Sequence, residues 1–121
     1  MNTYTILALP GPNNSRSMAF GLNEKGDVAG VALDRDVGVL WQANSVPFSL
    51  PPTSWSTFIG LNDRGEVVGQ LGEDVHTAIA VLVRDHEAHH LRLPEETGWL
   101  ATGINDSGRV CGSSVGGDWN V

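Results

Sequence analysis

Histidine is the residue type in this chain best suited to bind a transition metal, and three of its four histidines lie close together. They are His86, His89 and His90, with acidic residues on both sides of the first. Successive residues of a strand point to opposite faces, so at most one of His89 and His90 can join His86 at a common ion. A polar loop that leads into a strand explains the same residues. We therefore expect no metal site here, and no cofactor elsewhere in the chain.

Oxygen ligands recur in three pairs of an asparagine and an acid, which makes calcium the second metal to consider. The pairs are Asn23-Glu24, Asn62-Asp63 and Asn105-Asp106. A calcium loop of the EF-hand type needs acidic residues at alternating positions and a bidentate glutamate at its end. Neither feature follows these pairs, whereas asparagine is a strong turn former. We therefore interpret the pairs as turns.

Tryptophan offers the remaining binding chemistry. Trp55 and Trp99 each stand shortly before one of these asparagines, in a predicted loop of small and polar residues, and Trp119 stands near the end of the sequence. A tryptophan repeated at one loop position can stack on a sugar ring or anchor a protein partner. The alternative is that Trp55 and Trp99 pack against the next unit of the fold. Both interpretations stand at this point.

Catalytic patterns do not accompany these candidates. A glycine-rich phosphate loop followed by a helix is absent from the sequence. Cys111 falls within a predicted strand without a recognisable histidine partner, and Glu95 and Glu96 diverge in an extended segment. We expect that the protein is not an enzyme.

Charge and composition narrow the choice of partner and compartment. The chain of 121 residues has 7 Lys and Arg against 14 Asp and Glu, a formal charge of −7. Phosphate backbones are bound by clustered cations, so we expect no direct contact with nucleic acid. A single cysteine excludes an intrachain disulfide, and the apolar runs are too short to span a membrane. The N-terminus lacks a signal-peptide pattern, which predicts a cytoplasmic protein, or a secreted or surface protein if a leader has been removed.

A ten-residue motif occurs three times in the chain. It reads Gly-Leu-Asn-Glu-Lys-Gly-Asp-Val-Ala-Gly at 21–30, Gly-Leu-Asn-Asp-Arg-Gly-Glu-Val-Val-Gly at 60–69 and Gly-Ile-Asn-Asp-Ser-Gly-Arg-Val-Cys-Gly at 103–112. This pattern predicts a type I turn closed by a glycine bulge, with the asparagine side chain folded onto the backbone and the second glycine in a left-handed conformation. The turn residues are Asn23, Gly26, Asn62, Gly65, Asn105 and Gly108. After the turn, the glycine of Val-x-Gly lets the strand pass close to a neighbouring backbone.

Short apolar segments around each motif predict strands, and no window has the 3.6-residue period of an amphipathic helix. We therefore predict one all-β domain with four-stranded antiparallel units at about 1–43, 44–85 and 86–121. The expected strands are 4–9, 19–22, 28–31 and 37–41 in the first unit, 48–50, 58–61, 67–71 and 78–83 in the second, and 89–93, 101–104 and 110–113 in the third. The fourth strand of the third unit is missing or reduced to the segment around Trp119.

Four antiparallel strands per repeat are typical of a β-propeller blade. Propellers close with roughly four to eight blades, and this chain has three units. Two sheet faces would then lack a neighbour, and we expect them to be covered. We favour a homodimer that closes a ring of six units. The alternatives are a piece of a longer protein and an open stack capped by a partner.

The motif resembles the HAF repeat, whose core is Gly-Ile-Asn-Asp-x-Gly-x-Val-Val-Gly followed by an apolar strand ending in Leu-Trp. Residues 103–110 and Leu40-Trp41 match it closely. The His-Ala-Phe tripeptide that gives the repeat its name is degenerate, with Gly38-Val39-Leu40 and Ile79-Ala80-Val81 in its place. The resemblance covers nearly the whole chain. It implies a propeller-type β protein of a kind often found in secreted or surface bacterial proteins, and it implies no particular biochemical activity.

These observations lead to a hypothesis of function and two alternatives. The hypothesis is a non-enzymatic module that binds another protein through its loops or a sheet edge and acts as a homo-oligomer. In its sharper form, the acidic chain occupies a basic, nucleic-acid-binding surface of the partner and inhibits it. One alternative is a carbohydrate-binding module that uses Trp55 and Trp99. The other is a structural part of a larger surface protein.

Overall fold

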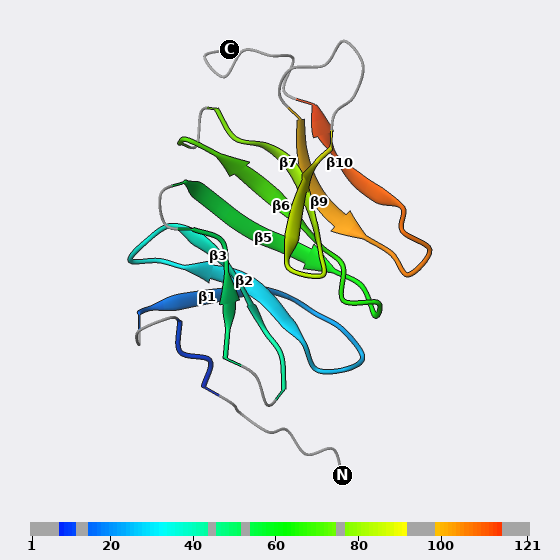
Figure 1. Ribbon diagram of the computed structural model, residues 1–121. Helices are drawn as coiled ribbons and strands as arrows, with labels where there is room; N and C mark the ends of the chain where they lie inside the picture. Colours follow the sequence, from blue (N-terminus) through cyan, green and yellow to red (C-terminus); the bar gives the residue numbers. More distant parts are fainter. Residues whose placement is uncertain are drawn as a thin grey trace.

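The fold is a stack of antiparallel sheets in which each repeat motif forms the tip of a hairpin. The computed structural model describes residues 8–11, 15–43, 46–51, 54–74, 77–91 and 99–114 (Figure 1). The strands are β1 (Ser17–Leu22), β2 (Val28–Ala32), β3 (Val37–Trp41), β4 (Phe48–Ser49), β5 (Trp55–Leu61), β6 (Val67–Gly72), β7 (Ile79–Arg84), β8 (Glu87–His90), β9 (Trp99–Ile104) and β10 (Val110–Ser114). The described residues contain no helix, which confirms the all-β prediction.

Strands that follow one another in the chain pair with one another, so each sheet is an antiparallel meander. The first sheet has the order β1-β2-β3-β4, the second β5-β6-β7-β8, and the third consists of β9 and β10. Among the described residues there is no helix of the length and apolarity needed to cross a bilayer.

The sheets are offset by one strand from the units expected from the sequence. The segment expected to open the second unit provides β4, which pairs with β3 of the first sheet. Likewise β8, which overlaps the strand expected at 89–93, pairs with β7 of the second sheet. Its hairpin turns through Asp85 and His86, which have φ of 52° and 64°. Two left-handed residues make a tight two-residue hairpin, but this turn lacks the Gly or Asn from which such a hairpin is predicted in a sequence.

The strands expected at the two ends of the chain are not seen among the described residues. Of the strand expected at 4–9, residues 8 and 9 are irregular, and the rest lies outside the described residues. The segment around Trp119 also lies outside them.

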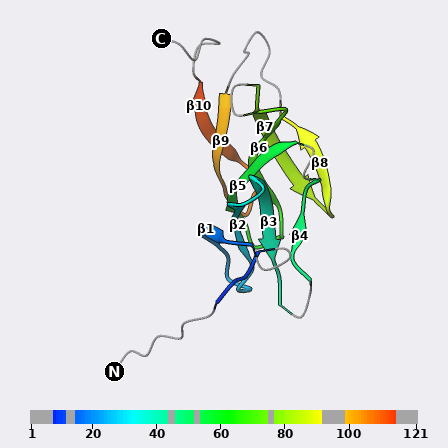
Figure 2. The ribbon, with the colours of Figure 1, turned by 90° about the vertical axis from the view of Figure 1, so that its left-hand side faces the viewer.

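The second and third sheets each pack their first strand against the face of the preceding sheet. The strand β5 contacts β1, β2 and β3, and β9 contacts β5, β6 and β7 (Figures 1 and 2). Phe58 on β5 is fully buried, and its ring fills the space beside Gly38 on β3, where a Cβ atom would lie 2.5 Å from the ring. Val68, Ala80 and Ala101 form the corresponding contact between the second and third sheets. The described strands form an open stack, so ring closure stays a prediction.

Candidate functional site

Each repeat motif builds the same turn. In the first, Oδ1 of Asn23 accepts hydrogen bonds from the backbone N–H groups of Lys25 at 3.0 Å and Asp27 at 2.9 Å. The backbone N–H of Gly26 donates to the carbonyl of Asn23 at 3.1 Å, and Gly26 has a φ of 83°. This is a type I turn closed by a glycine bulge. The other two turns repeat these bonds, with φ of 78° at Gly65 and 85° at Gly108.

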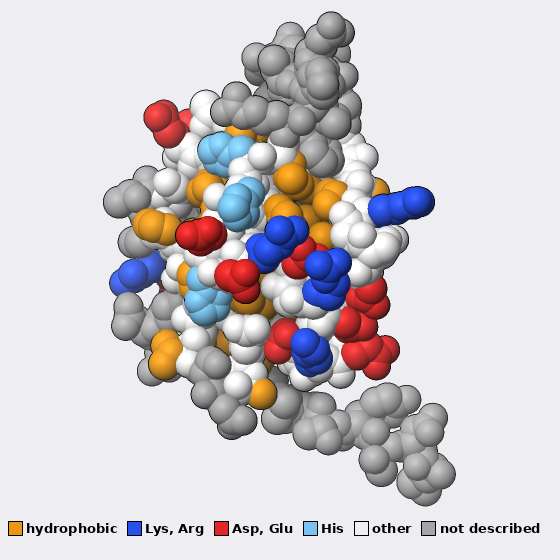
Figure 3. Space-filling model, turned by 45° about the vertical axis from the view of Figure 1, so that its right-hand side comes forward, with side chains coloured by type: hydrophobic (Ala, Val, Ile, Leu, Met, Phe, Trp, Pro, Cys, Tyr) orange, Lys and Arg blue, Asp and Glu red, His pale blue; other side chains and the backbone are white. Residues whose placement is uncertain are grey.

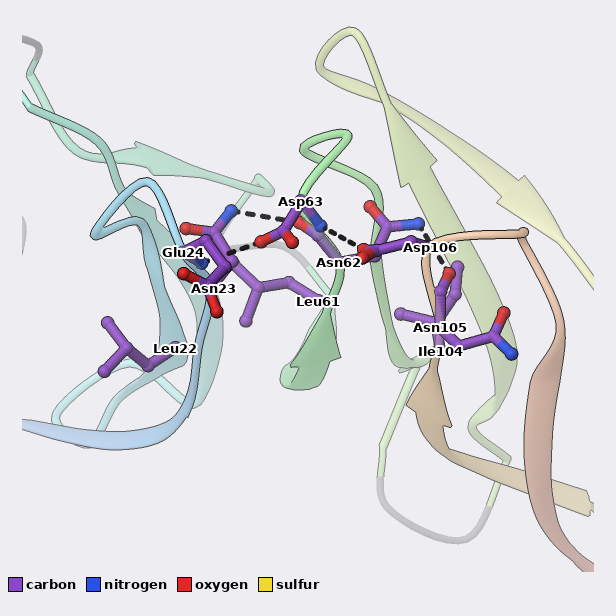
Figure 4. Close-up of a pocket in the computed structure, with 9 residues that line it drawn as sticks. All are labelled: Leu22, Asn23, Glu24, Leu61, Asn62, Asp63, Ile104, Asn105 and Asp106. Carbon is purple, nitrogen blue, oxygen red and sulfur yellow. Dashed lines mark hydrogen bonds between the residues drawn. The ribbon is translucent and has the colours of Figure 1, made fainter.

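The three turns are also bonded to one another (Figure 4). Nδ2 of Asn23 donates to the backbone carbonyl of Asn62 at 2.9 Å, and Nδ2 of Asn62 donates to the carbonyl of Asn105 at 2.9 Å. A second line of bonds joins the residues that follow the asparagines. The backbone N–H of Glu24 donates to Oδ1 of Asp63 at 2.7 Å, and that of Asp63 donates to Oδ1 of Asp106 at 2.8 Å. We call these two lines of bonds the turn ladder.

The turn ladder borders an open groove of about 620 Å³, to which each turn contributes a leucine or isoleucine, an asparagine and an acid. The lining residues are Leu22, Asn23, Glu24, Leu61, Asn62, Asp63, Ile104, Asn105 and Asp106. Two of the three acids already accept backbone N–H groups of the ladder. The repeated acid therefore joins neighbouring units, a role beyond the turn formation expected from the sequence.

A buried carboxylate supports the middle of the ladder. Glu66 is 3% exposed, and its Oε1 accepts a hydrogen bond from Nδ2 of Asn62 at 2.8 Å. Its Oε2 lies 2.7 Å from Nη2 and 2.9 Å from Nε of Arg84. The hydrogen bond from Asn62, with Arg84 and then Arg64 alongside, holds the pKa of Glu66 below its usual value of 4.5 against the opposing effect of burial.

The third turn departs from this arrangement. Asp27 accepts a hydrogen bond from Nδ2 of Asn23 at 2.9 Å in the first turn, as Glu66 does from Asn62 in the second. Arg109 occupies this position in the third turn and offers no acceptor. Among the described residues, Nδ2 of Asn105 has no hydrogen-bond partner, and Asn105 is exposed.

Residues at one repeat position also differ in exposure. Leu22 and Leu61 each precede a turn asparagine, yet Leu61 is 9% exposed and Leu22 is 70% exposed. Leu61 is covered because it packs on the first sheet, with Cδ2 3.0 Å from the place of a Cβ on Gly21. Within the part of the chain that the structure describes, no sheet covers Leu22 in this way.

Met18 and Phe20, on the same strand as Leu22, are 50% and 47% exposed. Met18 pairs with Val31 and Leu22 pairs with Val28, so the bulge at Phe20 leaves Met18 and Leu22 on opposite sides of the sheet. We call the side of β1 that carries Leu22 the β1 apolar face.

The tryptophans lie elsewhere than expected. Trp55 and Trp99 are the first residues of β5 and β9, paired with Gly72 and Ser114, so their placement in loops is wrong. The strand β5 extends further than its apolar residues suggest because the polar Ser56 is buried in it, where Oγ accepts the backbone N–H of Gly38 at 2.8 Å. Trp55 is half-buried and does not line the groove of the ladder. Trp119 lies outside the described residues.

The clustered histidines are exposed and spread along one hairpin. His86 lies in its turn, where its ring stacks on Phe48 with centroids 4.3 Å apart and planes at 8°. His89 and His90 follow on β8, opposite Leu82 and Val81 of β7. Within the described ranges, no three His, Cys, Asp or Glu side chains are grouped as metal ligands. Cys111 is exposed on β10.

No protein-family model, curated protein or solved structure matches this chain. Its likeness to the HAF repeat therefore rests on the motif.

Proposed function

We propose that the chain is a non-enzymatic protein-binding module, built from repeats of the HAF type, that binds its partner through the β1 apolar face. The observation that carries this proposal is the contrast between Leu22 and Leu61. At this repeat position the second unit has a leucine buried against another sheet, whereas the first unit leaves it 70% exposed. Burying a leucine side chain contributes roughly 1.5–3 kcal/mol, so a protein that covers this strand gains binding energy.

The position of β1 in its sheet supports the same surface. This strand is an edge of the first sheet, with β2 on its other side. Edge strands with apolar side chains are sites at which another chain can pack or pair. Ala19 is exposed on the same side of the strand as Leu22, because their partners Gly30 and Val28 share one face of β2, and it extends the apolar contact along the strand.

Charge supports a narrower form of the proposal, in which the partner has a basic surface that the chain blocks. The formal charge is −7. On the face seen in Figure 3, several Asp and Glu side chains gather at the lower right margin, and Lys, Arg and further acidic side chains are mixed over the rest of the face. Complementary charge of this kind accelerates association and makes it sensitive to salt.

The experiment measures binding with matched variants of the face. The wild-type protein, Leu22→Ser and Val46→Ser serve as baits in the lysate of the protein's own host, and each captured protein is then purified for affinity measurement. Val46 is 89% exposed and lies outside β1, so its variant controls for a general loss of apolar surface. We expect Leu22→Ser alone to weaken binding, by about tenfold or more. Equal affinity of the purified partner for all three baits would overturn the proposal.

Salt dependence tests the proposal of a basic partner, and glycan binding tests the carbohydrate-binding alternative. Affinity that falls steeply between low and high salt supports a basic partner, and affinity that does not change removes that form. Carbohydrate binding is tested on a glycan array with the wild type, Trp55→Ala and Trp99→Ala. A glycan bound by the wild type and lost by both folded variants would replace the proposal with the carbohydrate-binding alternative.

A further inference from the structure

The turn ladder has a direction. In both of its steps, the earlier turn donates through an asparagine Nδ2 and a backbone N–H, and the later turn accepts through a backbone carbonyl and an Asp carboxylate. Its two ends therefore differ. The first turn presents acceptors, the carbonyl of Asn23 and the carboxylate of Glu24. The third turn presents donors, Nδ2 of Asn105 and the backbone N–H of Asp106.

These two ends are complementary. The acceptors of the first turn and the donors of the third turn are the same kinds of groups that bond to each other between neighbouring turns at two places within the chain. The carbonyl of Asn23 corresponds to the carbonyls of Asn62 and Asn105, each of which accepts a bond from the preceding turn. The carboxylate of Glu24 corresponds to those of Asp63 and Asp106, each of which also accepts one.

The apolar contact between the first two sheets also has an unoccupied counterpart at each end of the turn ladder. Between the first two sheets, Leu61 packs on Gly21. Leu22 corresponds to Leu61 and is exposed, and Gly103 corresponds to Gly21. Among the described residues, only Sγ of Cys111 lies within 4 Å of the place of a Cβ on Gly103. Gly103 therefore leaves room for a leucine from another sheet.

Charge favours the same pairing. The first turn has two acids, Glu24 and Asp27, and one lysine, Lys25, whereas the third has Asp106 and Arg109, so their formal charges are −1 and 0. A first turn therefore meets less repulsion beside a third turn than beside another first turn.

We infer that a second copy of this chain docks the edge strand β1 of its first sheet, beside the part of that face that Leu9 and Pro10 cover, on the third sheet of the first copy and continues the turn ladder between molecules. In this contact Asn105 Nδ2 donates to the carbonyl of Asn23 of the second copy, and the Asp106 N–H donates to the carboxylate of Glu24 of the second copy. Leu22 of the second copy packs on Gly103. The contact is head-to-tail, so it forms a ring or a filament according to the rotation between copies. The inference rests on the proposed function and names the partner of the β1 apolar face.

Two variants test the two ends separately. Asn105→Asp keeps an oxygen that can accept the N–H groups of Ser107 and Arg109, so the turn is retained while the Nδ2 donor is lost. Leu22→Ser removes the apolar contact from the other end. Val46→Ser is again the control, and the unfolding temperature of each variant verifies its fold. Sedimentation velocity of the full chain from about 1 μM to 1 mM covers the range of weak to moderate association.

We expect the wild type and Val46→Ser to associate with rising concentration. Asn105→Asp should weaken this association about 3- to 10-fold, the effect of one hydrogen bond, and Leu22→Ser about tenfold or more. An equimolar mixture of the two weakened variants should form a 1:1 complex more readily than either variant alone. In that mixture, the intact Leu22 end of one variant meets the intact Asn105 end of the other.

Two outcomes would overturn the inference. One is a wild type that stays monomeric throughout the range. The other is association that Asn105→Asp leaves unchanged, which would indicate a contact between two β1 faces instead. The proposed function is judged separately. It survives a monomeric wild type if a different purified protein binds in a Leu22-dependent manner, and it fails if Leu22→Ser affects no binding.

Discussion

The side chain of Asn23 donates a hydrogen bond to the backbone carbonyl of Asn62, 2.9 Å away and 39 residues further along the chain. The same amide group closes the turn of Asn23, because its Oδ1 accepts the N–H groups of Lys25 and Asp27. One repeated residue thus has two roles. It shapes each hairpin, and it holds each hairpin against the next.

The first prediction compares asparagines along the turn ladder. Asn62→Ala removes four hydrogen bonds of a residue that is 3% exposed, and it takes from Oε1 of the buried Glu66 the hydrogen bond that Asn62 donates. We expect it to lower the free energy of unfolding by about 2–4 kcal/mol, several times a single net hydrogen bond. Asn105→Ala at the exposed end should cost about 1 kcal/mol. Urea denaturation measures both, and equal losses would show that the ladder adds nothing to the turns.

The second prediction concerns the left-handed glycine of the middle turn. Gly65 has a φ of 78°, and a Cβ placed on it would have no heavy atom within 4 Å. Gly65→Val should therefore lower the free energy of unfolding by about 1 kcal/mol or more through backbone strain alone. Gly65→Asn is the matched variant, because asparagine tolerates this conformation, and it should cost less. Thermal unfolding tests the pair, and a neutral Gly65→Val would contradict the turn geometry.

The third prediction concerns the glycine that closes the middle motif. A Cβ on Gly69 would collide with the backbone carbonyl oxygen of Thr57 on the neighbouring strand. Backbone cannot move aside as a flexible side chain does, so Gly69→Ala should cost about 1–3 kcal/mol, the range for overpacked cores. Gly30→Ala, at the same repeat position in the first unit, should be destabilising in the same way, because a Cβ on Gly30 would collide with the carbonyl oxygen of Met18. A Gly69→Ala protein with an unchanged unfolding temperature would show that the strands have room to separate.

The sequence predicts what is local in this fold and misses what is not. The turns at Asn62 and Gly65 follow from turn chemistry within five residues, and the strands beside them follow from apolar residues. The pairing of β4 with β3 depends on where the chain returns, and the hairpin at Asp85 and His86 contains no glycine, which is the strongest sequence signal for such a turn.

The turn ladder is the main feature of the candidate site that sequence reasoning missed. Its signal was present, because an acid follows the asparagine in all three motifs. Turn formation alone explains an acid at this position, so the sequence does not indicate that the acid also bonds to the neighbouring unit. The contrast between Leu22 and Leu61 is likewise invisible in the sequence, since both are leucines at one motif position and only the stacking of sheets separates them.

The fourth prediction concerns pH and the buried carboxylate. The folded-state pKa of Glu66 is lowered, first by the hydrogen bond from Asn62, so folding favours the charged form. The resulting stability is present above the unfolded-state pKa near 4.5 and is lost as the pH falls through the lower folded-state pKa. Glu66→Gln should therefore lower the free energy of unfolding by about 1–3 kcal/mol at pH 7, and the gap to wild type should shrink below about pH 4.

Urea denaturation of both proteins between pH 3 and pH 7 measures this gap, with Glu73→Gln as the control because Glu73 is exposed. Other carboxylates also titrate in this range, and the difference between wild type and variant isolates Glu66 from them. A gap that stays constant with pH would mean that Gln replaces only the shape of Glu66 and that its charge, held by Asn62 and Arg84, does not stabilise the ladder. A gap that closes on acidification ties the stability of the middle turn to that buried charge.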